Sequence, residues 1–483
     1  MEFEEEQGLF GHVVDGFHLW AYCRFSVYMK IEEILNRQNK RTVGEKPPTV
    51  RDALGMLANC TIRSPALRAP RAERLFFCHA RKVPDNGAYK CIYTDDIAAL
   101  HPEISVSSEF LYNNGHLKPG YLKNVQYLDY VDILPVLGRK AAEAANRKQL
   151  ARIASLCKDI TRRINEAFGV ALEERYLSSM ASKRYIWYKQ KKKLLTGYIR
   201  RVAPKVIVET VGYETNKLII NEIGKELGIT TVELQHGVIG KGHIAYNYLK
   251  KNEGPFLPDY LFVFSDYWKQ TASYPIPEDR VIVAGYPYLE SMMEKYPPRR
   301  GGSDRLELLV ISQPEYSIKL LEDVKRMLAE LKASGIGYHL SYKLHPAEFS
   351  MDNSAFAALE ADGNVDVIKD TSVNLYSLFA KADLQVGVTS TAIYEGLAYS
   401  LPTLILHYEK TDAYMGQLCA SGCARMCGDG TEAARLAELQ QRGELRLQGA
   451  EKTVFFKPDA LKTIDELLTG LARGRSGSKA AEI

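Results

Sequence analysis

Two series of short apolar runs, each run separated from the next by a helix-like segment, constrain the fold of this chain more than any other feature. The first series lies between residues 205 and 284 and the second between residues 306 and 406. Asn216–Leu227 and Ile318–Ser334 are each followed by a glycine, as expected for helices that connect strands. Strands that alternate with helices form a parallel sheet covered by helices. We therefore predict an α/β protein with two Rossmann-like domains that face a cleft.

The expected elements have clear bounds in the sequence. The strands of the first series are expected at 205–209, 230–234, 260–264 and 281–284. Those of the second series are expected at 306–311, 338–344, 365–368, 384–388 and 403–406. Elsewhere we expect buried strands at Glu73–Ala80 and Tyr89–Thr94, and helices at Leu9–Leu35, Gly138–Glu174 and after Pro458.

A segment with two prolines, two glycines and no apolar periodicity separates the two series. It reads YPPRRGGSD at Tyr296–Asp304, which is typical of a linker. The chain is therefore divided into a first domain at 1–296 that begins with a helical extension, a linker at 297–304, a second domain at 305–473 and a disordered tail at 474–483.

The charge of the chain is nearly balanced, with 63 basic and 59 acidic residues and a net charge of +4. A nucleic-acid-binding protein is expected to be more basic, so this class is excluded. One stretch departs from the balance, because Lys183–Arg201 holds eight basic residues with aromatic residues interleaved and no acid. Two interpretations stay open: a solvated helix face, and a peripheral contact with anionic lipid or an anionic acceptor.

The first residues and the cysteines favour a cytoplasmic protein, at most peripheral at the inner face of the membrane. Met1–Gln7 is acidic, unlike a secretory signal, and no apolar run approaches the roughly 20 residues that cross a bilayer. The eight cysteines are expected to be reduced thiols. Cys419, Cys423 and Cys427 have a spacing that could line one side of a helix, but they lack the C-x-x-C pairs of a zinc site. We expect no metal.

The second domain carries a first polar cluster, Lys343-Leu344-His345-Pro346, at the end of a predicted strand. Ligands bind at such strand ends in open α/β sheets. Pro346 cannot continue the strand, so His345 lies where the chain turns. An imidazole there can donate a hydrogen bond to a phosphate oxygen, with Lys343 as a nearby cation. The alternative is a histidine that only stabilises the turn.

A second cluster in the same domain combines hydroxyl groups with a carboxylate. Thr389, Ser390 and Thr391 follow a predicted strand and open a helix, and Glu395 lies one turn after Thr391. A hydroxyl can cap the helix, whose free N–H groups and dipole then suit an anion. Glu395 can accept both hydroxyls of a ribose. The alternative is plain capping with a solvated carboxylate.

The first domain carries a third cluster, Gln235-His236-Gly237, after the strand at 230–234, and His243 ends the loop that follows. Gly237 lets the backbone turn or approach a ligand closely. His236 or His243 can act as a general base or as a donor to phosphate. A packed histidine beside a glycine turn is the alternative.

A fourth cluster supplies two carboxylates. Glu209 ends the strand at 205–209, and Glu214 follows a loop that contains a glycine. Either can take a proton from an acceptor hydroxyl, whereas a surface or helix-start acid is the structural alternative. The sequence has no G-x-x-x-x-G-K-[ST], G-x-G-x-x-G, H-E-x-x-H or G-x-S-x-G motif. This argues against P-loop NTPases, nicotinamide enzymes, zincins and α/β-hydrolases.

In this order on two α/β domains, the four clusters resemble those of GT-B glycosyltransferases. More narrowly, the chain resembles bacterial surface-polysaccharide transferases, including capsule sialic acid and Kdo transferases and teichoic-acid glycerophosphotransferases. The resemblance covers Lys205 to about Tyr408. It implies that Lys343–Pro346 and Thr389–Thr391 hold the phosphates of the donor nucleotide and that Glu395 holds its ribose.

The same resemblance implies that the catalytic base comes from the first domain, the acceptor side, at Glu209, Glu214 or His236, with His345 acting on the leaving phosphate. Gln235-His236-Gly237 is similar to the His-Gly signature of the glycerophosphotransferases, which have a tryptophan where Gln235 stands.

The resemblance implies a metal-independent glycosyltransferase with no cofactor that works in the biosynthesis of a surface polysaccharide such as a capsule. It would move a sugar from a nucleotide-activated donor, CMP- or UDP-linked, to a glycan or lipid-linked acceptor. Three alternatives stay open: a CDP-glycerol-type glycerophosphotransferase, a non-hydrolysing nucleotide-sugar epimerase, and a non-catalytic carbohydrate-binding or assembly protein.

Overall fold

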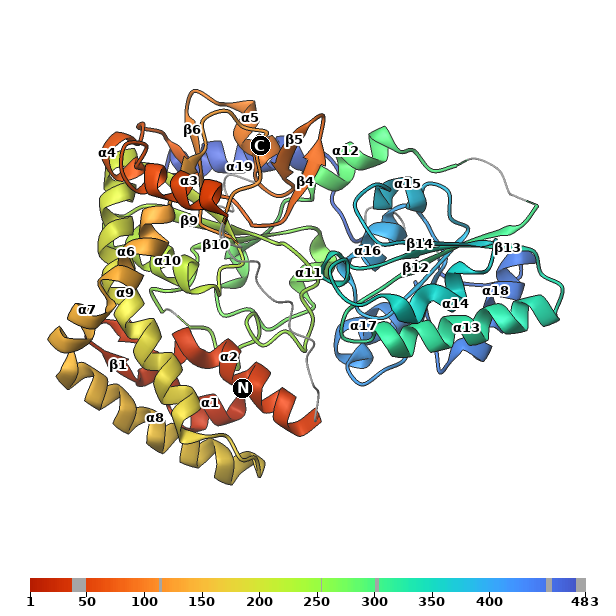
Figure 1. Ribbon diagram of the computed structural model, residues 1–483, viewed down its shortest axis with the longest axis horizontal. Helices are drawn as coiled ribbons and strands as arrows, with labels where there is room; N and C mark the ends of the chain where they lie inside the picture. Colours follow the sequence, from red (N-terminus) through yellow and green to blue (C-terminus); the bar gives the residue numbers. More distant parts are fainter. Residues whose placement is uncertain (37–48, 113–114, 253, 300–303, 449–453, 475–483) are drawn as a thin grey trace.

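Two parallel sheets, one in each of two lobes that lie side by side, make up the computed structural model (Figure 1). The structure describes residues 1–36, 49–112, 115–252, 254–299, 304–448 and 454–474. All strand pairs within these two sheets are parallel. The predicted α/β class with two Rossmann-like domains is confirmed.

The first sheet has seven strands, and its central strands are buried on both faces. In order across the sheet they are β11 (Val281–Val283), β10 (Tyr260–Val263), β9 (Thr230–Leu234), β8 (Val206–Thr210), β3 (Arg74–Phe77), β6 (Ser105–Glu109) and β7 (Gln126–Tyr127). Val208 lies between Phe76 on β3 and Val232 on β9, so the middle of the sheet is apolar. The polar strand β6, which reads SVSSE, was not predicted.

The second sheet has six strands, and five of them follow the predicted runs within one residue. In order they are β14 (Val365–Ile368), β13 (Tyr338–Lys343), β12 (Leu306–Ile311), β15 (Leu384–Gly387), β16 (Thr403–Leu406) and β17 (Arg425–Cys427). Leu308 lies between Leu340 and Leu384 in neighbouring strands. Parallel strands buried on both faces read as unbroken apolar runs, which is why their positions were visible in the sequence.

Helices cover both sheets. In the first lobe they are α1 (Glu2–Glu6), α2 (Leu19–Asn36), α3 (Val50–Cys60), α4 (Pro65–Arg68), α5 (Asp95–Leu100), α6 (Asp129–Leu137), α7 (Arg139–Ala145), α8 (Arg147–Phe168), α9 (Glu174–Val202), α10 (Thr215–Leu227), α11 (Asp266–Lys269) and α12 (Pro287–Lys295). In the second lobe they are α13 (Ser317–Ala333), α14 (Ala357–Glu360), α15 (Leu375–Phe379), α16 (Thr391–Ala398), α17 (Thr411–Ala420) and α18 (Gly430–Gln441).

Three expectations for the first 200 residues need correction. Leu9–Leu35 is not one helix, because a 3₁₀ turn and a small hairpin of β1 (Val13–Val14) and β2 (Phe17–His18) precede α2. Asp15 and Gly16 form the turn of that hairpin with positive φ, which stops a helix there. Gly138–Glu174 is broken at Asn146 and after Phe168. Tyr89–Thr94 is only partly a strand, β5 (Ala88–Cys91), paired with β4 (Lys82–Asp85) outside the main sheet.

The last helix, α19 (Ala460–Ala472), returns to the first lobe. The sequence had placed it in the second domain, which was predicted to end at residue 473. Its apolar stripe, with helical spacing, packs against β3 and β8 of the first sheet. The stripe consists of Ile464, Leu467, Leu468 and Leu471. The guanidinium of Arg74, 2% exposed, donates to Asp465 at 2.6 Å and to Thr469 at 2.6 Å. The chain therefore crosses between the lobes twice.

The basic stretch Lys183–Arg201 lies within α9, whose tyrosines and Ile186 are buried in the core. Lys191 binds Asp132 at 2.6 Å, and Lys192 binds Glu222 at 2.8 Å. Arg184 and Lys189 also have partners inside the first lobe. Lys183, Lys193, Arg200 and Arg201 of this stretch remain exposed.

The three closely spaced cysteines do not share a helix face: Cys419 is on α17, Cys423 follows it, and Cys427 is on β17. Among the residues that the structure describes, no three His, Cys, Asp or Glu side chains are grouped so that they could hold a metal ion. Within the same described ranges, no helix is both long and apolar enough to cross a membrane. Residues 300–303 of the linker and 475–483 of the tail lie outside the described residues.

We predict that Leu468→Ala destabilises the first lobe, because Leu468 packs against the first sheet. The side chain is fully buried, and the loss of such a leucine costs about 2–5 kcal/mol. Hydrogen exchange measured by mass spectrometry should then rise in β3 and β8. Lys462→Ala, on the exposed face of the same helix, should change stability by less than about 0.5 kcal/mol. Faster exchange confined to the second sheet would contradict this packing.

Candidate functional site in the cleft between the domains

The loop after β9 meets the start of α16, so the carboxyl-terminal edges of the two sheets face each other. The backbone N–H of Val238 donates to the hydroxyl of Thr391 at 3.0 Å. A Cβ on Gly237 would lie 3.1 Å from the same hydroxyl, so this close approach favours glycine. Two clusters that the sequence predicted on separate domains, Gln235–Gly237 and Thr389–Thr391, are therefore in direct contact.

The three hydroxyls before α16 have three different partners. The hydroxyl and the N–H of Thr389 both donate to the side-chain oxygen of Gln313, at 2.8 and 3.1 Å. Ser390 is the N-cap of α16, and its hydroxyl accepts from the N–H of Ala392 at 3.3 Å. Thr391 makes the contact with the first domain. The hydroxyls thus hold the helix start at the cleft, where its dipole favours an anion.

A hydrogen bond from the backbone two residues later holds the ring of His345 in one tautomer. The ring Nδ1 accepts from the backbone N–H of Ala347 at 3.1 Å, and the backbone N–H of His345 donates to the carboxylate of Glu348 at 2.8 Å. A neutral imidazole whose Nδ1 accepts carries its proton on Nε2, so His345 offers an N–H donor. Burial, and then the positive charge of Arg81 across the cleft, lower the pKa of His345 to about 4. Pro346 begins the short 3₁₀ turn, Pro346–Glu348, that fixes this geometry.

Glu395 lies on the buried side of α16, with 4% of its surface exposed. Its carboxylate accepts from the hydroxyl of Tyr376 at 2.5 Å. Burial raises the pKa of Glu395, while Arg81 and Tyr376 act in the opposite direction. Glu395 is therefore not a solvated helix residue. It is a deep carboxylate positioned by a tyrosine from α15.

Arg81, which the sequence reasoning missed, is the cation of the cleft. It follows β3 and precedes β4, at the same edge of the first sheet as the loop after β9. Burial opposes its charge, but four acidic or phenolic side chains outweigh burial and raise its pKa: Tyr93, Tyr286, Glu395 and Tyr376. Solvent still reaches Arg81, as expected for a group that lines a cleft. Its position directly after a central strand of the sheet was the feature of the sequence that could have identified Arg81 as a candidate.

His236 stands where the cleft meets the interior of the first domain. Its carbonyl accepts from the hydroxyl of Tyr93 at 2.6 Å, and its ring lies 6.1 Å from that of His79. The hydroxyl of Tyr246 donates to Glu233 at 2.5 Å and lies 3.3 Å from Nδ1 of His236. Because that hydroxyl has already donated its proton, Nδ1–H of His236 is the donor in the second contact. Nε2 then keeps a lone pair.

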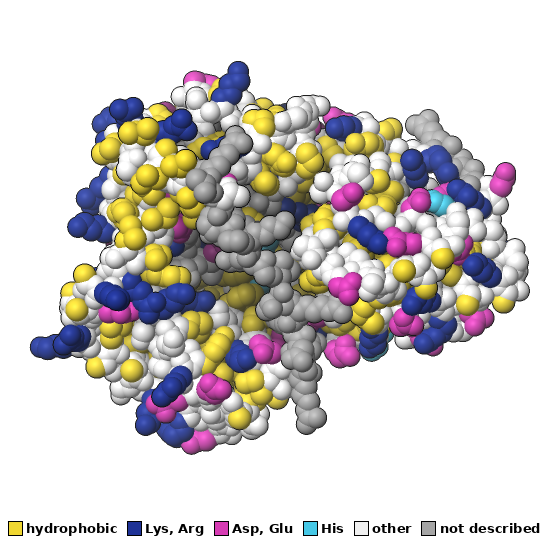
Figure 2. Space-filling view, in the orientation of Figure 1, with side chains coloured by type: hydrophobic (Ala, Val, Ile, Leu, Met, Phe, Trp, Pro, Cys, Tyr) yellow, Lys and Arg dark blue, Asp and Glu magenta, His cyan; other side chains and the backbone are white. Residues whose placement is uncertain are grey.

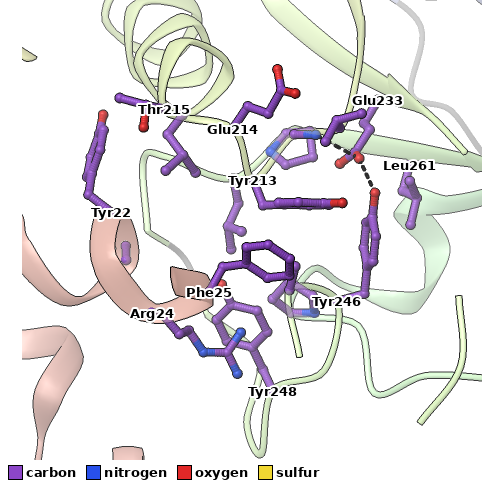
Figure 3. Close-up of a pocket in the computed structure, with 18 of the residues that line it drawn as sticks. Tyr22, Arg24, Phe25, Tyr213, Glu214, Thr215, Glu233, Tyr246, Tyr248 and Leu261 are labelled. Atoms are coloured by element: carbon purple, nitrogen blue, oxygen red, sulfur yellow. Dashed lines mark hydrogen bonds between the residues drawn. The ribbon is translucent and has the colours of Figure 1, made fainter. Parts of the chain in front are cut away.

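A cavity of about 490 Å³ opens beside His236 in the first domain (Figure 3). It lies between α2 and the segments after β8 and β9, and its lining is rich in aromatic rings: Tyr22, Phe25, Tyr213, Tyr246, Tyr248 and Tyr274. His79 and His236 also line the cavity. Burial, and then the positive charges of Lys217 and Arg81, lower the pKa of His79 to about 4. Burial is also the main cause that lowers the pKa of His236 to about 3, with smaller contributions from His79, His243 and Arg81. The cavity and the cleft are therefore neighbours.

Two of the predicted residues are buried and hydrogen-bonded within the first domain. Gln235 is 1% exposed, and its side chain donates to the carbonyl of Gly237 at 2.8 Å and accepts from the N–H of Phe264 at 2.9 Å. Glu209 has no exposed surface and accepts from Asn221 at 3.0 Å. Burial raises the pKa of Glu209. Strand β8 is buried along its whole length, so its last side chains do not reach the cleft.

The remaining predicted residues lie near the site without facing its centre. Glu214 lines the cavity, and burial raises its pKa, but its carboxylate points away from the ring of Tyr213 (Figure 3). His243 packs its ring 4.9 Å from that of Tyr246. Lys343 donates to the carbonyl of Asp370 at 2.5 Å, on the side of β14. The cation near His345 is therefore Arg81 from the other domain.

Comparison with solved structures identifies the architecture. A protein of Listeria monocytogenes assigned as a UDP-N-acetylglucosamine 2-epimerase matches with a TM-score of 0.50 at 9% identity, over 84% of this chain and 98% of that one. The chain has a GT-B fold. The UDP-N-acetylglucosamine 2-epimerase of Neisseria meningitidis, bound to its substrate, matches at 11% identity over 81% and 97% of the two chains, with a TM-score of 0.48.

The wall teichoic acid polymerase TagF matches this GT-B protein at 12% identity over 88% and 97% of the two chains, with a TM-score of 0.41. No family model matches the sequence, and no curated protein matches it. At these identities the likeness shows the fold alone.

We predict that Arg81→Gln raises the pKa of His345 from about 4 toward its usual value near 6.5, because a neighbouring positive charge is removed. NMR titration of the imidazole measures this shift. Arg435→Gln, an exposed change on α18, should leave the titration unchanged. An unchanged pKa in Arg81→Gln would show that the two side chains do not face each other in solution.

Proposed function

We propose that this GT-B protein is a glycosyltransferase that moves a sugar from a nucleotide-activated donor in the cleft to a hydroxyl of a glycan acceptor in the first domain. One observation carries the proposal: groups that suit an anion lie close to His236, which also lines an aromatic cavity. The cleft offers Arg81, an imidazole N–H and a helix start, which suit a phosphate. The cavity offers aromatic faces, which suit a sugar ring.

The donor phosphates would lie between Nε2 of His345, the guanidinium of Arg81 and the first turn of α16. Each of these groups offers a hydrogen-bond donor or positive charge without needing to reorganise. Such preorganised donors stabilise the charge that grows on a leaving phosphate. Glu395, held by Tyr376, would accept the hydroxyls of the ribose. A CMP- or UDP-linked donor fits this division of roles.

The acceptor would occupy the aromatic cavity with one hydroxyl toward His236. We assign the general base to this histidine rather than to Glu209, which is fully buried. Glu233 accepts from Tyr246, and Tyr246 accepts from Nδ1–H of His236, so Nε2 is free to take a proton. The carboxylate behind the tyrosine would stabilise the imidazolium that forms.

The transfer step then balances with these groups alone. Nε2 of His236 takes the proton of the acceptor hydroxyl as its oxygen bonds to the anomeric carbon. The bond from that carbon to the phosphate oxygen breaks, and its electron pair stays on the phosphate. Arg81 and His345 stabilise the resulting charge. Closure of the two domains would exclude water.

A separate acceptor space favours a transferase over an epimerase, which acts on a single substrate. Donor incubated alone should therefore remain unchanged, whereas an epimerase would convert it. A surface-polysaccharide acceptor, at the inner face of the membrane, remains part of the proposal because the sequence clusters resemble those of such transferases.

We predict that a matching nucleotide raises the Tm of the wild-type protein and that His345→Ala removes most of this rise. A ligand at 100 times its Kd stabilises a protein by about 2.7 kcal/mol, which a thermal-shift screen of CMP, CDP, UDP, GDP and dTDP detects. His339→Ala is the matched control, because His339 lies on β13 but binds Glu307 and Asp366 away from the cleft. An undiminished rise in His345→Ala would refute the phosphate role.

We predict that His236→Gln keeps the nucleotide-induced rise in Tm but lowers kcat about 10²–10⁴-fold, because a general base is removed while the donor site is intact. Sugar transfer to an acceptor glycan is the measurement. His243→Gln, in the same loop, should lower kcat far less. Transfer at the wild-type rate in His236→Gln would assign the base elsewhere.

A further inference from the structure

A patch of apolar side chains is exposed on the first domain, away from the residues of the cleft. Among the described residues, seven of the seventeen exposed large hydrophobic side chains lie within two short segments, 54–67 and 134–137. They are Leu54, Leu57, Ile62, Leu67, Leu134, Val136 and Leu137, and their exposed fractions range from 43% to 77%. Scattered exposed leucines are ordinary, but such a concentration marks an interaction surface.

The two segments form one surface. Helix α3 packs against α6, and α4 packs against α9. Asn59 of α3 donates to Asp129 of α6 at 2.9 Å, which ties the two segments together. Figure 2 shows hydrophobic side chains gathered over the part of the first domain where Figure 1 places α3, α4 and α6, with basic side chains around them. We call this surface the α3–α6 patch.

The exposed charge of the α3–α6 patch is mainly positive. Residues 53–72 contain Arg63, Arg68 and Arg71, all exposed, and no acidic residue. Residues 133–142 contain Arg139, which pairs with Glu143 at 2.6 Å, and Lys140. In the described part of the chain, no ion pair is formed by Arg63, Arg68 or Arg71. The end of α9 adds Arg200 and Arg201, both exposed.

We propose that the α3–α6 patch docks on an anionic lipid bilayer. Its leucines, valine and isoleucine would enter the boundary between headgroups and acyl chains, and its arginines would pair with lipid phosphates. Apolar insertion and electrostatic attraction together give peripheral membrane binding. The centre of this contact is formed by α3, α4 and α6. Basic residues in the middle of α9, such as Lys191 and Lys192, form ion pairs within the domain instead.

The charge pattern decides between a membrane and a second copy of the chain. In a two-fold symmetric dimer through this patch, the same arginines of both copies would face one another, and like charges facing each other oppose association. An anionic bilayer complements both the arginines and the apolar side chains. The proposal does not depend on the reaction in the cleft.

The full-length protein is tested by co-sedimentation with vesicles of phosphatidylcholine alone and of phosphatidylcholine mixed with phosphatidylglycerol. We expect binding to the mixed vesicles. Arg63→Gln, Arg68→Gln and Arg71→Gln together should weaken it about a hundredfold, because each basic residue at an anionic surface contributes about fivefold. Leu57→Gln with Leu137→Gln should also weaken binding.

Matched controls carry the same changes on other surfaces. They are Arg152→Gln, Lys158→Gln and Arg162→Gln together on α8, and Ile318→Gln on α13, all at exposed positions. Both controls should bind like the wild type, and circular dichroism should show all variants folded. Absence of wild-type binding, or equal loss in the α8 control, would overturn the proposal. So would a dimer in sedimentation velocity that Leu57→Gln with Leu137→Gln abolishes while vesicle binding persists.

Discussion

The hydrogen bond from the N–H of Val238 to the hydroxyl of Thr391 determines how closely the two domains approach at the site. It joins the loop after β9 directly to the first residue of α16. His236 lies two residues before Val238, and Ser390 caps the helix α16 that Thr391 begins. This one contact therefore sets the separation between the imidazole of His236 and the start of α16. Gly237 makes the approach feasible, since any side chain there would press on the same hydroxyl. Opening of the cleft has to break this bond.

Second in importance is the return of α19 to the first sheet. The buried guanidinium of Arg74 binds Asp465 and Thr469, and the loss of either partner would leave a buried charge poorly satisfied. Together with the linker, this helix gives the second domain two attachments to the first. Any motion between the lobes would have to bend the chain at both crossing segments.

Much of the fold could be predicted because parallel strands buried on both faces are nearly pure apolar runs. The same rule fails for β6, whose serines are buried but polar. Ser108 reaches the hydroxyl of Tyr198 at 2.6 Å, a long-range partner that no local pattern indicates. The sequence also could not predict which sheet α19 covers, because its apolar stripe could pack against either sheet. Only the partners of Arg74 decide which sheet it covers.

The polar clusters could be predicted as strand ends, but not their partners across the cleft. Arg81, Gln313 and Tyr376 are single residues in loops or short helices with no motif around them. Glu209 was predicted as a candidate base because it ends a strand, yet the strand is buried to its last residue. Sequence spacing places a residue at an edge of the sheet. It does not say whether its side chain turns outward.

Burial and positive charge govern the protonation of the histidines at this site. Burial is the largest cause that lowers the pKa of His79, His236 and His345, and the charge of Arg81 acts in the same direction on each. An anion beside Arg81 would offset the effect of that positive charge on His345. The pKa of His345 would rise as the anion binds, so binding would take up a proton at a pH between the two values. Reciprocally, lower pH within that range would strengthen anion binding. Arg81 would therefore have two effects: it would attract a phosphate, and its charge adds to the effect of burial in lowering the pKa of the imidazoles.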